Sequence, residues 1–195
     1  MKKKKPISKW KEQLPNTLTT INLTMGILAI FLLIGDFTVN TRRISCLLIF
    51  VGMVADALDG KVARALGVDS EMGKQLDSFA DSITFGLAPM IILYSFKELQ
   101  THNVLFLAII IYPLAGVYRL ARYNLGDFSD FFLGLPITAA GSIVALYCLL
   151  LSFSINIFGN ELAPFTALII FILSGLMVST VSVPRLGTKK KEVID

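Results

Sequence analysis

The chain has 195 residues, of which 54% are hydrophobic and only 16% are charged, and its mean hydropathy is +0.71. A soluble domain of this length carries more charge and confines its apolar residues to short periodic stripes. The composition therefore predicts an integral membrane protein. In that setting the net charge of +4 indicates attraction to anionic lipid headgroups, and we expect no nucleic-acid partner.

Six apolar runs are long enough to cross a bilayer as helices, which takes about 20 residues. They cover residues 15–34, 43–65, 74–97, 103–124, 134–154 and 162–182. None alternates between apolar and polar positions in the way that lipid-facing strands do. We therefore expect an all-α integral membrane protein, a six-transmembrane-helix bundle that forms one domain over residues 15–184.

Basic residues are distributed unevenly between the two ends of these predicted helices. Because an even number of spans places both termini on one side, that side receives all but three of the 18 lysines and arginines. The exceptions are Arg42, Arg43 and Lys97. The positive-inside rule then predicts that both termini are cytoplasmic. Residues 185–195 would be a basic cytoplasmic tail, and residues 1–14 either a short amphipathic interfacial segment or a solvated basic tail.

Four aspartates lie where the second predicted span ends and the third begins. Asp56 and Asp59 are three residues apart, and Asp77 and Asp81 are four apart, so each pair shares one helix face. The turn between the two helices is short, and either Asp69 or Ser70 would cap the second helix. Because this makes the helices antiparallel neighbours, we expect all four carboxylates to converge.

Such a cluster is costly inside a membrane. One aspartate at the centre of a membrane helix costs about 2.5–3.5 kcal/mol, so four cost on the order of 10 kcal/mol before their mutual repulsion. Hard carboxylate ligands suit Mg²⁺, Mn²⁺ or Ca²⁺, and no histidine or cysteine lies nearby to favour zinc. Four carboxylates are enough for two ions, an arrangement that stabilises a transferring phosphoryl group. The alternative is that these are interfacial helix ends.

Small residues and one arginine accompany the aspartates. Gly60, Ala63 and Gly73 leave room for a ligand or a neighbouring helix to approach the backbone. Arg64 adds a fixed cation that suits phosphate oxygens. Together with the metals, these residues predict a pyrophosphate site that faces the cytoplasm.

The stretch Asp56-x2-Asp59-Gly60-x2-Ala63-Arg64-x8-Gly73-x3-Asp77-x3-Asp81 resembles, in every fixed position, the signature of the CDP-alcohol phosphotransferase family. The resemblance implies a homodimeric enzyme that moves a phosphatidyl or related group from a CDP-linked lipid to an alcohol and releases CMP. It implies two divalent cations, Mg²⁺ or Mn²⁺, held by Asp56, Asp59, Asp77 and Asp81. Asp81 would also be the general base. The CDP moiety would be bordered by Gly60, Ala63, Arg64 and Gly73.

Four further segments are similar to the corresponding segments of the serine-accepting branch of that family. This resemblance implies an enzyme in the cell membrane of a prokaryote. They are PNTLTTINLTMG at 15–26, FGLAP at 85–89, RLARYN at 119–124 and FLGLP at 132–136. Thr138 departs from the pattern, because many relatives carry a second proline there. The resemblance implies CDP-diacylglycerol and L-serine as substrates. Glycerol 3-phosphate or inositol phosphate as acceptor, or an archaeal ether-lipid donor, remain alternatives.

Polar residues outside the signature supply candidate substrate contacts. Asn16, Thr19 and Asn22 enter the first predicted span, where they could bond the CDP moiety or bond across helices. Arg119 and Arg122 lie three apart at the cytoplasmic end of the fourth span, with Asn124 close behind. Cations there are costly unless they are occupied, and a serine carboxylate or a lipid phosphate is a natural partner. Alternatively the arginines anchor the helix at the interface.

Other reactions and functions are less well supported by the residues. A phosphohistidine route needs a well-placed histidine, and His102, the one histidine in the chain, falls in a predicted external loop. We therefore expect a single direct displacement. A membrane prenyltransferase would lack the Gly-x2-Ala-Arg insert, and a divalent-cation transporter would have no use for it. Cys46 and Cys148 are expected to be packing residues.

Overall fold

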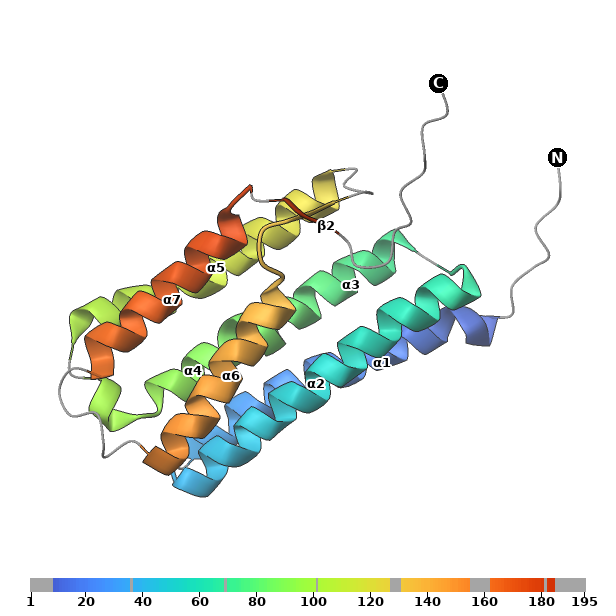
Figure 1. The fold of residues 1–195 in the computed structure, drawn as a ribbon. Coiled ribbons are helices and arrows are strands. Elements are labelled where there is room, and N and C mark those ends of the chain that lie inside the picture. Colours follow the sequence, from blue (N-terminus) through green and yellow to red (C-terminus); the bar gives the residue numbers. More distant parts are fainter. Residues whose placement is uncertain are drawn as a thin grey trace, which may run out of the picture.

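A computed structural model describes residues 9–35, 37–68, 70–100, 102–126, 131–154, 162–180 and 182–184. Its elements, in chain order, are α1 (Lys9–Gly35), α2 (Val39–Leu66), α3 (Glu71–Asp81), the π-helical turn η1 (Ser82–Leu87), α4 (Ala88–Tyr94), the 3₁₀ turn η2 (Lys97–Leu99), α5 (Asn103–Leu125), β1 (Phe131–Leu133), α6 (Ile137–Ser154), α7 (Leu162–Val178) and β2 (Ser182–Pro184). The described residues form an elongated helical bundle, in which α2 lies along α1 and α7 lies along α5 (Figure 1).

Each of the six predicted apolar runs coincides with a helical segment, so the prediction of an all-α fold is confirmed apart from one short strand pair. Within the described residues, three segments are long and apolar enough to cross a membrane: Gln13–Gly35, Glu71–Tyr94 and Asn103–Leu125. Two further helices, over Ile137–Phe153 and Leu162–Val178, are apolar but shorter. Six crossings and cytoplasmic termini therefore stay predictions. The last helix ends at Val178, earlier than expected, because the chain then turns into β2.

The outer surface of the bundle is apolar. Large side chains on five helices are at least half exposed, namely Phe31, Leu47, Leu114, Leu150 and Leu168. Monomeric soluble proteins rarely expose contiguous apolar surface on this scale, whereas a lipid-facing surface consists of it. The surface therefore agrees with the membrane location predicted from composition.

The predicted division at residue 14 falls within one helix and stays a prediction. Residues 9–14 form the first turns of α1, which continues without interruption through Pro15. Residues 1–8 and the predicted tail at 185–195 lie outside the described residues.

The turn between α2 and α3 is set by caps at both helix ends. Gly67 adopts the left-handed conformation with φ 63°, and its N–H donates to the carbonyls of Ala63 and Arg64. Ser70 is the N-cap of α3, as one of the two predicted alternatives, and its hydroxyl accepts a 3.0 Å bond from Gly73 N. Asp69 lies outside the described residues. The short turn brings the ends of the two aspartate-bearing helices together.

A π-helical turn follows Asp81 directly. Pro89 has no N–H to donate to the carbonyl of Phe85, four residues earlier, and that carbonyl instead accepts a long bond of 3.4 Å from the Tyr112 hydroxyl. Helix α6 packs directly on this turn, since a Cβ at Gly141 would lie 2.6 Å from the Phe85 carbonyl oxygen. π-Helical turns often occur at functional sites, and here the turn joins α3 to α4.

The FLGLP segment packs against the end of α7. β1 pairs antiparallel with β2, with Phe131 opposite Pro184. Gly134 then has a φ of 70°, and a Cβ there would lie 2.7 Å from the Met177 carbonyl oxygen. Leu135 N donates a 3.0 Å bond to the carbonyl of Leu176. The glycine is needed both for its backbone conformation and for the close approach of α7.

Candidate active site

Three carboxylates converge at one end of the bundle. Asp56 and Asp59 lie in the last turns of α2 and Asp77 lies on α3, and one oxygen from each lies within 4.8 Å of the others. Asp59 is buried and the other two are half-buried. Three of the four predicted aspartates therefore meet as their spacing indicated.

The fourth, Asp81, lies one turn further along α3 and is 6% exposed. Its Oδ1 accepts a 3.2 Å hydrogen bond from Nδ2 of Asn22 on α1. Its charge is repelled by those of Asp56 and Asp77, so it belongs to the same electrostatic cluster. It is not one of the three carboxylates that share the 4.8 Å group.

The three converging carboxylates leave bonding capacity unused. Oδ2 of Asp59 accepts a 2.8 Å bond from the Thr19 hydroxyl, whereas Oδ1 of Asp77 is buried and has no hydrogen-bond partner. A buried carboxylate oxygen without a partner is costly, and two neighbouring like charges add to that cost. An all-carboxylate donor set fits a hard divalent cation such as Mg²⁺ or Mn²⁺. This group of aspartates could therefore hold a metal ion.

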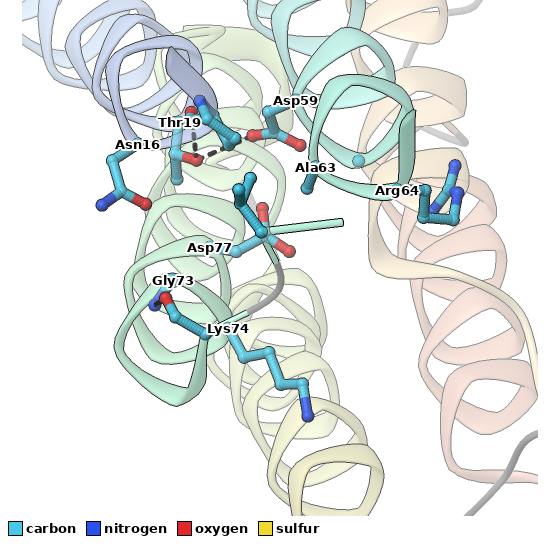
Figure 2. A pocket seen from close by; sticks show the side chains of 12 residues that line it. Asn16, Thr19, Asp59, Ala63, Arg64, Gly73, Lys74 and Asp77 are labelled. Atoms are coloured by element: carbon cyan, nitrogen blue, oxygen red, sulfur yellow. Dashed lines mark hydrogen bonds between the residues drawn. The ribbon is translucent and has the colours of Figure 1, made fainter. Parts of the chain in front are cut away.

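A cavity of about 210 Å³ adjoins the carboxylates between the ends of α1, α2 and α3. It is lined by Pro15, Asn16, Thr19, Asp59, Gly60, Ala63, Arg64, Val68, Ser70, Gly73, Lys74 and Asp77. Figure 2 shows Asp59 and Asp77 directed toward the same space, with the Thr19 hydroxyl bonded to Asp59. Of the residues predicted to border a CDP moiety, all but Asn22 line this cavity.

The signature glycines make room for polar groups around the cavity. A Cβ on Gly60 would lie 3.3 Å from Nη1 of Arg64, so the guanidinium folds back over the glycine one turn earlier. A Cβ on Gly73 would lie 3.0 Å from Ser70 Oγ and 3.3 Å from Asn16 Oδ1. Both glycines therefore admit side chains of their neighbours, in addition to any ligand.

Two polar lining residues, Ser70 and Lys74, were not predicted as site residues. Ser70 was considered only as a helix cap, and Lys74 only as one of the basic residues of the cytoplasmic side. Lys74 forms a 2.9 Å ion pair with Glu71 at the cavity rim. Its position directly after the signature glycine was the signal that could have identified it.

The three predicted substrate residues on α5 have different surroundings. Arg119 is 6% exposed, lies with Cζ 4.6 Å from the Tyr123 ring centroid, and its buried Nε has no hydrogen-bond partner. Its charge is attracted by that of Asp81. Arg119 is thus a buried cation close to the carboxylate cluster.

The other two are engaged within the protein. Arg122 donates from Nη1 to the Val178 carbonyl at 3.0 Å and from Nη2 to that of Ser179 at 3.2 Å, at the end of α7. Asn124 donates a 3.0 Å bond to the hydroxyl of Ser78, the neighbour of Asp77. Thr19 and Asn22 likewise bond across helices, which is one of the two alternatives that the sequence left open.

Comparison with known proteins identifies related sequences. The family described as CDP-alcohol phosphatidyltransferase matches residues 12–181. The chain is 36% identical over 149 residues to a protein from Mycobacterium leprae named CDP-diacylglycerol–serine O-phosphatidyltransferase, which covers 72% of this chain and 48% of that protein. The chain thus spans about half the length of the mycobacterial relative.

Two archaeal relatives match over more of their length. A Methanocaldococcus jannaschii protein with the same name is 32% identical over 173 residues, or 88% of this chain and 74% of the relative. A Methanothermobacter thermautotrophicus protein named archaetidylserine synthase is 36% identical over 176 residues, or 88% and 70% respectively.

Proposed function

Because the chain belongs to the CDP-alcohol phosphatidyltransferase family, we propose that it transfers a phosphatidyl group from CDP-diacylglycerol to the hydroxyl of L-serine, with phosphatidylserine and CMP as products. The observation that carries this proposal is the convergence of three carboxylates beside a cavity lined by the signature residues Gly60, Ala63, Arg64 and Gly73. Serine as the acceptor is supported by the names of the relatives.

The structure around α5 favours an acceptor with one carboxylate over one with a phosphate. A phosphorylated acceptor such as glycerol 3-phosphate calls for several cations, because a phosphate takes up more charge and more hydrogen bonds. Arg122 bonds two carbonyls at the end of α7, which leaves Arg119 as a buried cation near Asp81. Arg119 would bind the serine carboxylate, and Asn124 would support α3 through Ser78.

The metal site would be formed by Asp56, Asp59 and Asp77, with Mg²⁺ or Mn²⁺ as the cation. Bound there, a divalent cation neutralises negative charge that develops on the leaving CMP and polarises the phosphorus. The second ion that the sequence predicts would need Asp81 as a further ligand.

The other residues of the site would bind and orient the two substrates. Arg64 and Lys74 lie at the cavity and suit the diphosphate of the donor. The serine hydroxyl oxygen would attack the lipid-side phosphorus, so that a new P–O bond forms while the bond to CMP breaks. The hydroxyl proton would pass to a carboxylate oxygen of Asp81, which is the general base in this proposal.

Several finer points belong to the same proposal. The bundle would cross the cytoplasmic membrane of a prokaryote six times, with the cavity open to the cytoplasm, where serine and CMP are soluble. The homodimer implied by the family resemblance stays a prediction. Donors with ester-linked or ether-linked lipid tails both fit the proposal, since one relative is named archaetidylserine synthase.

The direct test is an acceptor screen. Purified protein is incubated with CDP-diacylglycerol, each candidate alcohol, and Mg²⁺, Mn²⁺ or Ca²⁺, while CMP release and the lipid product are measured by chromatography and mass spectrometry. We expect CMP release and phosphatidylserine with serine alone, and neither with the variant Asp81→Asn. CMP release with glycerol 3-phosphate instead of serine would reject serine as the acceptor. Cation flux into liposomes without CMP release would favour a transporter.

A further inference from the structure

Thr84, in the π-helical turn that follows Asp81, is fully buried between α1 and α2. Two glycines make its place. A Cβ on Gly26 of α1 would lie 2.8 Å from Thr84 Cα, and a Cβ on Gly52 of α2 would lie 2.8 Å from Thr84 Cγ2. The side chain of Thr84 is therefore inserted at a point where both neighbouring helices lack side chains.

A chain of two hydrogen bonds leads from Thr84 to Asp81. The Thr84 hydroxyl donates a 3.0 Å bond to the backbone carbonyl of Asn22, and Nδ2 of Asn22 donates a 3.2 Å bond to Oδ1 of Asp81. Thr84 and Asn22 are both 0% exposed, and Asp81 is 6% exposed. Through these buried hydrogen bonds, the three residues connect α1 to α3 and to the π-helical turn η1.

Asp81 needs such a partner to keep its orientation. The charges of Asp56 and Asp77 repel its carboxylate, and repulsion between like charges tends to turn that group away from the cluster. The Asn22 amide holds one carboxylate oxygen of Asp81, Oδ1, by its 3.2 Å hydrogen bond. A hydrogen bond to a charged group is also stronger than one between neutral groups.

The side-chain amide of Asn22 is only partly hydrogen-bonded, and a role in packing alone does not explain this energetic cost. Its Oδ1 is buried without a hydrogen-bond partner, and a Cβ on Gly52 would lie 2.9 Å from it. A leucine of similar size would fill this space without that penalty. The amide is therefore suited to orienting Asp81 and poorly suited to a role in packing alone.

We propose that Thr84 and Asn22 are positioning residues for Asp81: the π-helical turn places Thr84 so that its hydroxyl fixes Asn22, and Asn22 fixes the carboxylate that accepts the proton of the acceptor alcohol. The proposal rests on the proposed function, because the role of Asp81 belongs to it.

The test uses variants that remove one bond at a time in the full-length protein. Thr84→Val removes the hydroxyl and keeps the shape, Thr84→Ser keeps the hydroxyl, and Asn22→Leu removes the amide. Ser45→Ala is the matched control, since the buried Ser45 hydroxyl also donates to a carbonyl of α1, that of Ala29 at 2.9 Å. The kcat and KM for both substrates and the apparent melting temperature are measured for each variant.

We expect kcat to fall about fivefold in Thr84→Val and about 10- to 100-fold in Asn22→Leu, with both KM values within about twofold of wild type. Thr84→Ser should retain the wild-type kcat. The double variant should be no slower than Asn22→Leu, because Thr84 acts through Asn22. Ser45→Ala should lower the melting temperature without lowering kcat.

Three results would overturn the proposal: a wild-type kcat in Thr84→Val, multiplicative losses in the double variant, or an equal loss of kcat in Ser45→Ala. Hydrogen exchange of a peptide that spans residues 78–88 provides a readout that needs no turnover. Exchange should be faster in Thr84→Val and Asn22→Leu than in wild type and Ser45→Ala. Unchanged exchange would also reject the proposed positioning of Asp81. Failure of the wild-type protein to release CMP with any acceptor would reject the proposed function instead.

Discussion

The hydroxyl of Thr19 donates a 2.8 Å hydrogen bond to Oδ2 of Asp59, and so joins α1 to the carboxylate cluster across 40 positions of the chain. The same hydroxyl oxygen lies 3.1 Å from the carbonyl oxygen of Pro15. Thr19 is 3% exposed and lines the cavity beside the cluster. It therefore lies where it can orient Asp59 and also touch a ligand.

Removing this hydroxyl should weaken metal binding. Partners that orient a metal ligand typically contribute 10- to 100-fold to metal affinity, so in Thr19→Val we expect the half-saturating Mn²⁺ concentration to rise by about tenfold. Mn²⁺ is titrated in the turnover assay and by the rise in apparent melting temperature. Thr20→Val is the matched control, because exposed Thr20 makes the same back-bond, 2.7 Å to the Asn16 carbonyl. Equal Mn²⁺ dependence in both variants would contradict the role of Thr19.

Neutralising Asp77 should abolish the metal site. Its Oδ1 is buried without a partner, and Asp77→Asn replaces one of three converging carboxylates with a neutral amide. We expect Mn²⁺ affinity, measured by electron paramagnetic resonance of free Mn²⁺, to fall at least tenfold, and chelation by EDTA to stop turnover in wild type. Glu71→Gln on the same helix should bind Mn²⁺ like wild type, since its exposed pair with Lys74 contributes little. Undiminished binding in Asp77→Asn would place the metal elsewhere.

The two arginines of α5 should respond differently to substitution. Arg119→Ala should raise the KM for serine at least tenfold with little change in the KM for the CDP-lipid, because a charged partner of the carboxylate is lost. Arg122→Ala should leave the serine KM unchanged but destabilise the protein by about 1–2 kcal/mol, since its guanidinium bonds two carbonyls at the end of α7. Steady-state kinetics and thermal unfolding measure the two effects. A raised serine KM in Arg122→Ala alone would reverse the assignment.

The packing of the FLGLP segment against the end of α7 should depend on Gly134. Alanine is strained at a φ of 70°, and its Cβ would meet three carbonyl oxygens at 2.7–2.9 Å, so we expect Gly134→Ala to lower the apparent melting temperature by several degrees. Gly175→Ala is the matched control within α7, where an added Cβ meets nothing within 4 Å. It should not lower the melting temperature, since alanine favours a helix interior more than glycine does. Equal melting temperatures for the two variants would show that the segment can adjust.

The location of the acidic cluster was predictable because it depends on local periodicity. Residues three or four apart share a helix face, and a short capped turn makes two helices neighbours, so Asp56, Asp59 and Asp77 had to meet once those helices formed. Ser70 as a cap followed from the same local chemistry. The contacts of polar residues outside the signature could not be derived in this way. For Asn22 the sequence left open a bond to the CDP moiety or one across helices, and could not identify Asp81, 59 positions away, as the partner of its amide.

The helical membrane character and the acidic site could be predicted from apolar run length and residue spacing, because both act within one helix or between two consecutive ones. That Arg122 bonds the end of α7 while Arg119 stays near Asp81, and that Thr84 reaches α1 through a π-helical turn, could be seen only in the folded bundle. These outcomes depend on how helices distant in sequence rotate and pack. Gly26, Gly52 and Gly141 set that packing by permitting close approach, and each glycine acquires its meaning only from the residue that it meets.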